Sequence, residues 1–337
     1  MLVHNLRQTI IALSAIAFTG CQVVSSKPSI LAQAKPSIVA SHSILCHFVD
    51  AIAQDTVDLS CLIDGGQDPH TYRPSPSERK ALEQAQIVFY GGYNLEPQLI
   101  DLIEAVDSDT TRIAVYEAVV TEPIMAEHHH HGHEEKETNA EHDHHDHHDH
   151  EEELEADPHI WHDVNNAIAT VEYLQSELVQ LNPAQAALYL ENSAELIDQL
   201  KQLHIWIQEQ IATIPEGQRT LVTPHSGFNY YVKTYELENY LTLQGLSPED
   251  SPSAADVKNL VQQIRQTQVP TIFVETTANE RVINTVAREA GVKISDQELL
   301  VDGLGELGTD TDTYIQMMVQ NTCAIANGLE GNCQSYP

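Results

Sequence analysis

The sequence predicts an α/β protein made of two lobes, each a four-stranded parallel sheet with surrounding helices. Three observations lead to this expectation. The chain has 337 residues, which is enough for two domains of about 150 residues each. Short β-rich runs alternate with helical periodicity, a pattern typical of parallel sheets covered by helices. A long uninterrupted helical segment lies between the two sets of strands and predicts a connector.

Eight short β-rich runs define the two predicted sheets. They are Ser37–Ser41, Val57–Ile63, Gln86–Tyr90 and Arg112–Val115 in the first half, and Thr220–Thr223, Tyr240–Leu243, Thr271–Val274 and Val292–Ile294 in the second. Helical segments such as Asp256–Gln268 and Asn279–Ala290 lie between them. Gly291 is placed to end the second of these helices, because glycine readily adopts the left-handed conformation that closes a helix.

A long helix over residues 183–213 is predicted between the lobes. Neither proline nor glycine interrupts it after Pro183, and proline suits the first turn of a helix. Its apolar residues recur every three or four positions, at Leu196, Leu200, Leu203, Ile207 and Ile211. We interpret it as the connector between an N-terminal lobe, residues 35–182, and a C-terminal lobe, residues 214–337. Periodicity alone also allows an ordinary surface helix of one lobe.

Residues 1–34 have the character of an export leader. The apolar stretch Ile10–Phe18 follows a weakly positive start and is too short to span a bilayer, as in the core of a secretory signal. Two cleavage sites compete. Cys21 lies in a sequence that resembles a lipoprotein box, although Phe18 departs from its usual pattern, and cleavage there would leave a lipid on Cys21. The small residues Ala32 and Ala34 frame a second site, which would release a soluble protein.

The remaining four cysteines are even in number, as expected for disulfides in an oxidising compartment. Of the three possible connectivities we favour Cys46–Cys61 and Cys323–Cys333, because each closes a short local loop. Free buried thiols are the alternative. Zinc ligation by cysteine is not expected, since no two cysteines have the CxxC spacing.

The charge balance excludes nucleic acid as the partner. Fifty acidic residues against 16 basic ones give −34, whereas phosphate binding depends on Lys and Arg. About a third of this excess lies in residues 127–157, which hold 13 acidic residues, one lysine and almost no apolar side chain. Such a segment cannot bury enough apolar surface to fold alone, so we expect a disordered insertion in the first lobe.

Three histidines outside that insertion lie in loops marked by proline or glycine. His70 and His225 follow predicted strands, and His159 precedes a helical pattern. Ligands of open parallel sheets bind beyond the carboxyl ends of the strands, where such loops lie. Imidazole suits Zn²⁺, and a carboxylate from Asp or Glu can complete a tetrahedron. The three loops together therefore predict a metal site.

The surrounding motifs resemble those of the cluster A-I metal-binding proteins of ABC transporters, the ZnuA/TroA-like family. Two Asp-Pro-His motifs occur, the first followed by Tyr-x-Pro-Ser-Pro and the second by x-Trp. The run Thr-Pro-His-Ser-Gly-Phe-Asn-Tyr-Tyr that holds His225, then Phe273-Val274-Glu275, then Asp312-Thr313-Tyr314, follow in the family's order. The resemblance covers residues 35–329. It implies two lobes joined by a rigid helix, with the metal held between them.

The resemblance also implies which residues bind the metal. It assigns His70 and His159 from the first lobe and His225 and Asp312 from the second. The fourth position stays open, because Asp310 lies two residues from Asp312 and some family members complete the shell with water or a nearby acid. Members that import manganese have glutamate at the third position, where this chain has His225, so zinc is expected and manganese is the alternative. Three nitrogens and one oxygen also suit Zn²⁺ better than Mn²⁺.

Several neighbouring polar residues have predicted supporting roles. Asp68, Asp163 and Glu275 are candidates to orient an imidazole through its second nitrogen, and Glu275 can alternatively ligate. His162 is either an auxiliary ligand or, as we favour, a side chain that points away beside Trp161. Three further histidines match no ligand motif and are expected to be structural: His42, His47 and His204.

Eleven of the 19 histidines crowd into the acidic insertion. They are His128, His129, His130, His131, His133, His142, His144, His145, His147, His148 and His150. We call them the histidine tract and expect it to capture or buffer zinc through many interchangeable weak sites. A solvated spacer and a sensor of metal level are the alternatives.

Together these features predict an exported solute receptor rather than an enzyme. It would bind Zn²⁺ in the periplasm, either soluble or tethered through Cys21, and deliver it to an ABC permease in the inner membrane; we expect a monomer. A zinc hydrolase is the competing class, but the sequence has no HExxH motif and an acidic fourth ligand would close the coordination shell. A stand-alone metal buffer or surface adhesin is a third class.

Overall fold

A computed structural model describes residues 34–107, 109–127, 154–248, 252–277 and 280–337. The expected leader with Cys21 and the whole histidine tract lie outside these residues. The chain divides into two compact units, residues 1–34 and 35–337, and the description below concerns the second. Within the described residues, no helix combines the length and the apolar character needed to cross a membrane.

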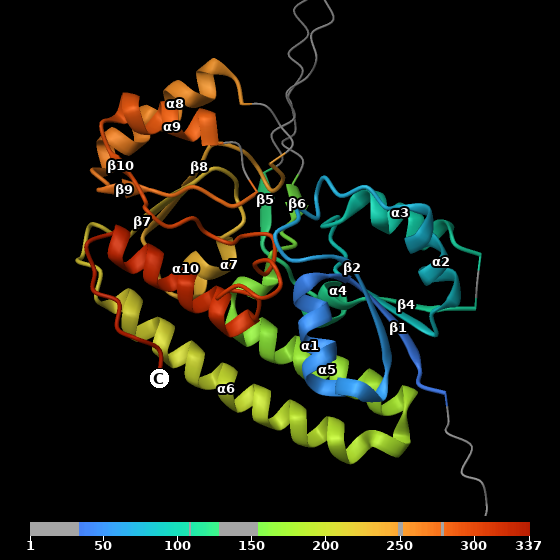
Figure 1. Cartoon of the computed structure of the whole chain (residues 1–337). Coiled ribbons are helices and arrows are strands. Elements are labelled where there is room, and N and C mark those ends of the chain that lie inside the picture. The colour runs from blue at the N-terminus through green and yellow to red at the C-terminus, as the bar shows by residue number, and fades with distance from the viewer. Residues whose placement is uncertain (1–33, 108, 128–153, 249–251, 278–279) are drawn as a thin grey trace, which may run out of the picture. The chain divides into compact units, whose positions relative to one another are not determined.

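The first lobe contains a four-stranded parallel sheet of order β2-β1-β3-β4 (Figure 1). Its strands are β1 (Ser37–His42), β2 (Asp58–Ile63), β3 (Ile87–Tyr90) and β4 (Thr111–Ala114). The helices of this lobe are α1 (Ser43–Ala53), α2 (Pro76–Gln84), α3 (Pro97–Ala105) and α4 (Val115–Val119), with a 3-10 turn η1 (Gln54–Thr56). Strand β1 is central and its last five residues are buried, because helices cover both faces of a parallel sheet.

The sheet of the second lobe consists of two parallel pairs rather than one regular ladder. The pairs are β7 (Thr220–Thr223) with β8 (Asn239–Thr242) and β9 (Thr271–Ile272) with β10 (Lys293–Ile294). The backbone N–H of Phe273 donates to Val222 O at 2.9 Å and links the pairs. The last two strands are shorter than predicted; after Ile272 the chain pairs with the segment at Leu299, whose N–H donates to Val274 O at 2.9 Å. The helices of this lobe are α7 (Asn229–Thr234), α8 (Ala254–Thr267), α9 (Glu280–Ala290) and α10 (Tyr314–Gly328).

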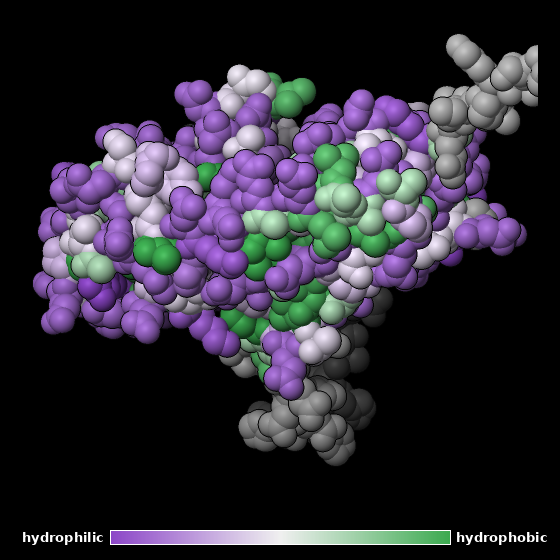
Figure 2. All heavy atoms as spheres, turned by 90° about the horizontal axis from the view of Figure 1, so that it is seen from below, coloured by the Kyte–Doolittle hydropathy of each residue, from purple (hydrophilic) through white to green (hydrophobic). Residues whose placement is uncertain are grey.

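The predicted connector is α6 (Ala186–Ala212), which follows α5 (Val164–Leu181) and a 3-10 turn η3 (Pro183–Gln185). It packs on α1 and α5 of the first lobe and on α10 of the second. Its five periodic Leu and Ile residues are all buried, so the prediction of a helix that joins two α/β lobes is confirmed. Figure 2 views the side on which α6 lies; that surface is mostly hydrophilic, with some apolar residues between.

A short antiparallel hairpin, β5 (Met125–Glu127) and β6 (Leu154–Ala156), encloses the part of the insertion that is not described. The predicted boundaries of the disordered segment, residues 127–157, were therefore too wide at both ends. Ladder hydrogen bonds order Glu127 and Leu154–Ala156, and Asp157 is fully buried. A 3-10 turn, η2 (Ile160–His162), then leads into α5.

Both predicted disulfides form. Cys46–Cys61 ties α1 to β2, and Cys323–Cys333 ties the C-terminal tail to α10, with Cα–Cα distances of 5.7 and 5.1 Å. The tail then runs against the connector, where the Gln334 N–H donates to Gln210 Oε1 at 2.8 Å. The second disulfide therefore helps to fasten the tail across α6 and α10.

Candidate metal centre

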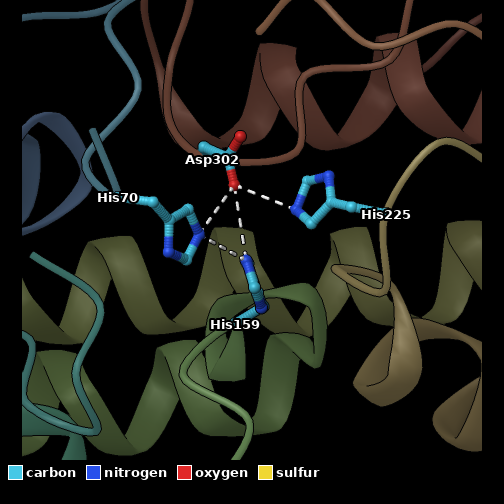
Figure 3. A group of neighbouring side chains, drawn as sticks. All are labelled: His70, His159, His225 and Asp302. Atoms are coloured by element: carbon cyan, nitrogen blue, oxygen red, sulfur yellow. Dashed lines mark hydrogen bonds and ion pairs between the residues drawn. The ribbon is translucent and has the colours of Figure 1, made fainter. Parts of the chain in front are cut away.

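Four buried side chains from the two lobes converge on one point (Figure 3). They are His70 and His159 from the first lobe and His225 and Asp302 from the second, and their facing ligand atoms all lie within 4.8 Å of one another. Oδ1 of Asp302 lies 3.4 Å from His70 Nε2, 3.3 Å from His159 Nε2 and 3.4 Å from His225 Nε2. All four residues are at most 4% exposed. The three predicted histidines are thus brought together with one carboxylate.

Each of these side chains stands where a strand or strand-like segment ends. His70 lies in the loop after β2, and His225 follows β7 directly. His159 comes between β6 and η2, and Asp302 follows the segment that bridges to Glu275 at Leu299. The parallel arrangement explains the positions of His70, His225 and Asp302, because the carboxyl ends of parallel strands open onto the same crevice. His159 instead follows the antiparallel hairpin β5–β6.

Buried carboxylates fix the orientation of two imidazoles. His159 Nδ1 lies 2.8 Å from Asp157 Oδ1, and His225 Nδ1 lies 2.6 Å from Glu275 Oε2. A proton on each Nδ1, donated to these carboxylates, leaves the Nε2 lone pair free to face the centre of the cluster. Asn229 in turn donates to Asp157 Oδ2 at 3.0 Å, so a residue of the second lobe helps to hold a histidine of the first.

The electrostatics of the cluster couple its histidines to Asp302. Burial lowers the pKa of His225, but the charges of Glu275 and Asp302 outweigh this and raise it well above its usual value. Burial likewise lowers the pKa of His159, yet its contacts with Asp157 and Asp302 raise it overall. Burial raises the pKa of Asp302, but the surrounding imidazoles hold it well below its usual range. A cation that binds here must therefore displace imidazolium protons.

The structure does not bring Asp312 into the cluster; Asp302 takes the place expected for it. Asp312 is partly exposed and its Oδ2 accepts a hydrogen bond from the Gly308 N–H at 2.8 Å, while Asp310 is exposed. Asp312 lies just before α10 and its carboxylate is engaged in the turn that precedes this helix. The Asp312 carboxylate therefore stabilises this turn and is not part of the cluster.

The three predicted orienting acids have different positions. Glu275 contacts an imidazole, as described above. Asp68 instead accepts hydrogen bonds from the His70 backbone N–H at 2.8 Å and the Thr71 hydroxyl at 2.9 Å. Asp163 accepts from the Asn165 N–H and caps the N-terminus of α5. Asp68 and Asp163 therefore shape local backbone, which is the usual role of aspartate in turns and at helix starts.

The other histidines lie apart from the cluster. His162 is buried and its Nε2 donates to Val301 O at 2.9 Å; burial lowers its pKa to about 3, so it stays neutral. His42 Nε2 pairs with the Tyr116 hydroxyl at 2.9 Å, and His204 Nδ1 lies 3.3 Å from the Tyr235 hydroxyl. His47 lines a surface pocket of about 740 Å³ together with Asp312.

Two residues of the centre were missed in the sequence. Asp302 directly follows the apolar run Leu299–Val301, which is a weak signal, because many carboxylates end such runs without binding a metal. Asp157 belongs to the second Asp-Pro-His motif, in which only the histidine was assigned a role. Its contact with the imidazole depends on burial, which the motif alone does not reveal.

Close backbone contacts flank Asp302 and join the lobes. The Gly66 N–H donates to Leu304 O at 2.8 Å, and a Cβ added at Gly65 would lie 2.0 Å from Gly305 O. We call residues 65–66 and 304–305 the backbone clasp. The Leu304 N–H also donates to Ser43 Oγ at 3.0 Å. Only glycine at position 65 permits this approach, which holds the Asp302 segment against the first lobe.

The donor set and its spacing suit a small divalent cation. Four ligands about 2.0–2.1 Å from a tetrahedral ion lie about 3.3 Å from one another, close to the distances observed around Asp302 Oδ1. His225 Nε2 and Asp302 Oδ1 are buried and make no hydrogen bond with a described residue; their contact of 3.4 Å is an ion pair, an arrangement that suits two donors to one shared cation. Two α/β lobes joined by a helix, with such a cluster between them, define a receptor for a metal ion.

The comparisons with known proteins agree with this class. A family model described as "Zinc-uptake complex component A periplasmic" matches residues 38–328, and the chain belongs to this family. It is 29% identical to a "Manganese-binding lipoprotein MntA" of Halalkalibacterium halodurans, over 87% of this chain and 88% of that protein. It is also 29% identical to a "Manganese ABC transporter substrate-binding lipoprotein PsaA" of Streptococcus pneumoniae, over 95% of this chain and 97% of that one.

A solved structure extends the agreement to the fold. The "periplasmic zinc binding protein TroA" from Treponema pallidum superposes with a TM-score of 0.75 at 26% identity, covering 88% of this chain and 99% of that chain. The protein is accordingly a metal-binding substrate-binding component of ABC transporters, and its family consists of solute receptors rather than enzymes.

Proposed function

We propose that the protein captures Zn²⁺ between its lobes and delivers it to the permease of an ABC importer. His70, His159, His225 and Asp302 are the proposed ligands. The single observation that carries the proposal is the position of Asp302 Oδ1, which lies 3.3–3.4 Å from the Nε2 atoms of three buried imidazoles. Three nitrogens and one oxygen at this spacing support a closed tetrahedral shell of the kind zinc prefers.

Manganese is the alternative cargo. The names of the two relatives given above favour it, because both are called manganese proteins, whereas the name of the structural neighbour favours zinc. The donor chemistry supports zinc, since His225 adds a third imidazole where an oxygen donor would suit Mn²⁺ better. Glu275 is an oxygen donor close by, but its contact with His225 Nδ1 occupies it.

The experiment that separates the two metals is a competitive titration of the full-length chain in which the eleven tract histidines are replaced by serine. Metal-buffered Zn²⁺ and Mn²⁺ are titrated against a chelator of known affinity, so that only the site between the lobes is measured. We expect one ion per chain and tighter binding of zinc. Tighter binding of manganese would overturn the zinc assignment.

Delivery to a permease is tested in cells. A strain that lacks the gene should lose zinc uptake at limiting zinc, and the gene for the His159→Ala variant should fail to restore it. Normal uptake without the gene would favour the metal-buffer class. Zinc-dependent turnover by the purified protein would revive the hydrolase class.

We further propose that the histidine tract captures or buffers zinc for the site between the lobes. Adjacent histidines and carboxylates supply many weak metal ligands, and the described hairpin β5–β6 lies next to Asp157, which contacts His159. The tract variant is expected to bind fewer zinc ions and to support less uptake at limiting zinc. If the tract variant binds as many zinc ions and supports as much zinc uptake as the parent, the tract does not capture zinc, and the interpretation as a solvated spacer is favoured.

The place of action is proposed from the leader and the relatives. Cleavage at Cys21 would give a lipid-tethered receptor, in line with the lipoprotein names of the relatives, and cleavage after Ala34 would give a soluble one. Mass spectrometry of the mature protein distinguishes a lipid-modified Cys21 from a free N-terminus at Lys35. We propose residues 35–182 and 214–337 as the two lobes and a monomer as the working form, which light scattering tests.

A further inference from the structure

The two carboxylate oxygens of Asp302 have different surroundings. Oδ1 faces the three imidazoles at 3.3–3.4 Å, as Figure 3 shows, while Oδ2 points away from them. Oδ2 accepts a hydrogen bond of 2.5 Å from the hydroxyl of Thr277. Asp302 is only 2% exposed, so solvent does not compete freely for this oxygen. The carboxylate therefore presents one oxygen to the site and has the other engaged.

Thr277 is held in place by the strand-like segment that also carries Glu275. Glu275 bridges to Leu299, and the Thr276 N–H donates to Leu299 O at 3.1 Å. This pairing sets the segment beside the chain that leads to Asp302. Glu275 orients His225, and Thr277 reaches Asp302 two residues further on. One short segment thus controls both second-lobe side chains of the cluster.

We propose that Thr277 is a specificity-determining residue that restricts Asp302 to binding the metal through Oδ1 alone. The hydroxyl donates to Oδ2 and opposes the rotation that would bring both oxygens onto the ion. The shell is thereby limited to three nitrogens and one oxygen. This inference rests on the proposed function, because it concerns how the same site discriminates between zinc and manganese.

The chemistry of the two ions makes this restriction selective. Zn²⁺ is satisfied by four ligands in a tetrahedron, whereas Mn²⁺ favours more ligands and a larger share of oxygen. A carboxylate that binds through one oxygen completes the first arrangement, and one that binds through both supplies the extra oxygen that the second prefers. Loss of the Thr277 hydroxyl should therefore move the site toward manganese.

The test compares three variants of the full-length chain with serines in the histidine tract. Thr277→Val keeps the shape and removes the hydroxyl, Thr277→Ser keeps the hydroxyl, and Thr276→Val makes the same change at the exposed neighbouring residue. Competitive titration gives the ratio of zinc to manganese affinity. We expect Thr277→Val to lower this ratio about tenfold, within the 10–100-fold range over which hydrogen bonds to metal ligands change metal affinity, because zinc loses affinity and manganese does not; the other two variants should leave the ratio unchanged.

X-ray absorption of the manganese-loaded chains supplies a second readout, because manganese is the ion that would use the second oxygen. The parent should show four light-atom ligands and Thr277→Val five, while Thr277→Ser should return to four. An unchanged affinity ratio, or equal weakening of both metals without a fifth ligand, would overturn the proposal, since a merely structural residue behaves in that way. Circular dichroism of each variant identifies any that fail to fold, and Thr277→Ser then decides whether the hydroxyl is what matters.

The outcome is separable from that of the proposed function. If the parent itself prefers manganese, the zinc assignment fails, but the effect of Thr277→Val on the ratio and on the ligand number still tests the role of Thr277. If the parent prefers zinc and Thr277→Val changes neither quantity, zinc capture stands and the role of Thr277 is rejected.

Discussion

The two Asp-Pro-His motifs share three residues but hold their histidines differently. In the second motif Asp157 contacts both the backbone N–H and the Nδ1 of His159, and Asn229 of the other lobe binds its second oxygen. In the first motif Asp68 binds the backbone N–H of His70 and the Thr71 hydroxyl. The aspartate thus shapes the turn in both motifs but orients the imidazole only in the second.

Burial explains the difference. Asp157 and His159 are fully buried, whereas Asp68 is partly exposed and His70 retains 4% exposure. A buried carboxylate needs hydrogen-bond partners, and the imidazole Nδ1 and the Asn229 amide supply them. A partly exposed carboxylate has no such need. Identical motifs therefore give one imidazole that its own aspartate orients and one whose aspartate contacts only the backbone and the Thr71 hydroxyl.

The largest effect is expected from removal of the histidine side chain of either motif. His70→Ala and His159→Ala should each weaken zinc binding more than about 100-fold, because loss of a ligand exceeds the 10–100-fold cost typical of a supporting hydrogen bond. Competitive titration in the tract-serine background measures both. Retained affinity in either variant would remove that histidine from the proposed ligand set, provided circular dichroism shows a folded chain.

Substitution of the two motif aspartates should have different effects on zinc affinity. Asp157→Asn should weaken zinc binding about 10–100-fold, because the charged partner of the His159 Nδ1–H is lost. Asp68→Asn should change both the affinity and the stability little, because the asparagine side-chain oxygen can still accept the hydrogen bond from the His70 N–H. The matched pair is measured by titration and thermal unfolding. Equal effects on affinity would show that both aspartates orient imidazoles.

The pH dependence should reflect the imidazoles that carboxylates hold. The raised pKa values of His159 and His225 mean that, in the metal-free form, both imidazoles hold their second proton to a higher pH than the usual value of 6.5. Lowering the pH through these raised values therefore favours the protonated form and weakens zinc binding, by about tenfold per pH unit for each proton displaced. Titrations between pH 5.5 and 8.5 should show the decline beginning above pH 6.5, and a decline only below that value would contradict it.

Residues 65–66 of the backbone clasp lie in the loop of the first motif, and a substitution there is expected to have a smaller effect. Gly65→Ala would place a Cβ 2.0 Å from Gly305 O and cost about 1–3 kcal/mol in the closed arrangement, with faster zinc release. Stopped-flow transfer of zinc to a chelator measures the rate. Gly291→Ala is the control. Gly291 has a φ of 79° at the end of α9, a conformation that strains an alanine, so this variant should lower the melting temperature without changing the rate of zinc release.

The smallest effect is expected for Asp312→Ala. Its carboxylate accepts a hydrogen bond from the Gly308 N–H and lies outside the cluster, so zinc affinity should stay within about twofold, while Asp302→Ala should abolish tight binding. The same titration measures both. A large loss in Asp312→Ala alone would reverse the assignment of the fourth ligand.

Much of the fold could be predicted because it follows local patterns. The strands of the first sheet, the connector and both disulfides lie where alternation, periodicity and short cysteine spacing placed them. The second sheet was harder, since β9 and β10 depend on pairing with distant segments rather than on their own composition. The lengths of β9 and β10 therefore depend on tertiary contacts, which the local sequence pattern does not reveal.

The candidate site was partly predictable for the same reason. His70, His159 and His225 lie in recognisable loops, and the structure brings them together. Asp302, Asp157 and Thr277 become informative only through neighbours distant in the sequence, such as Asp302 beside His159 or Thr277 beside Asp302. A motif can identify a histidine, but the carboxylate that orients it depends on burial.

The equal division of the cluster between the lobes has a mechanical consequence. Each lobe contributes two of the four donors, so neither lobe alone offers more than half of a tetrahedral shell. A small separation of the lobes would cut the number of donors from four to two without breaking any element of either sheet. Separation of the lobes would therefore be enough to release the ion, with no competing ligand required.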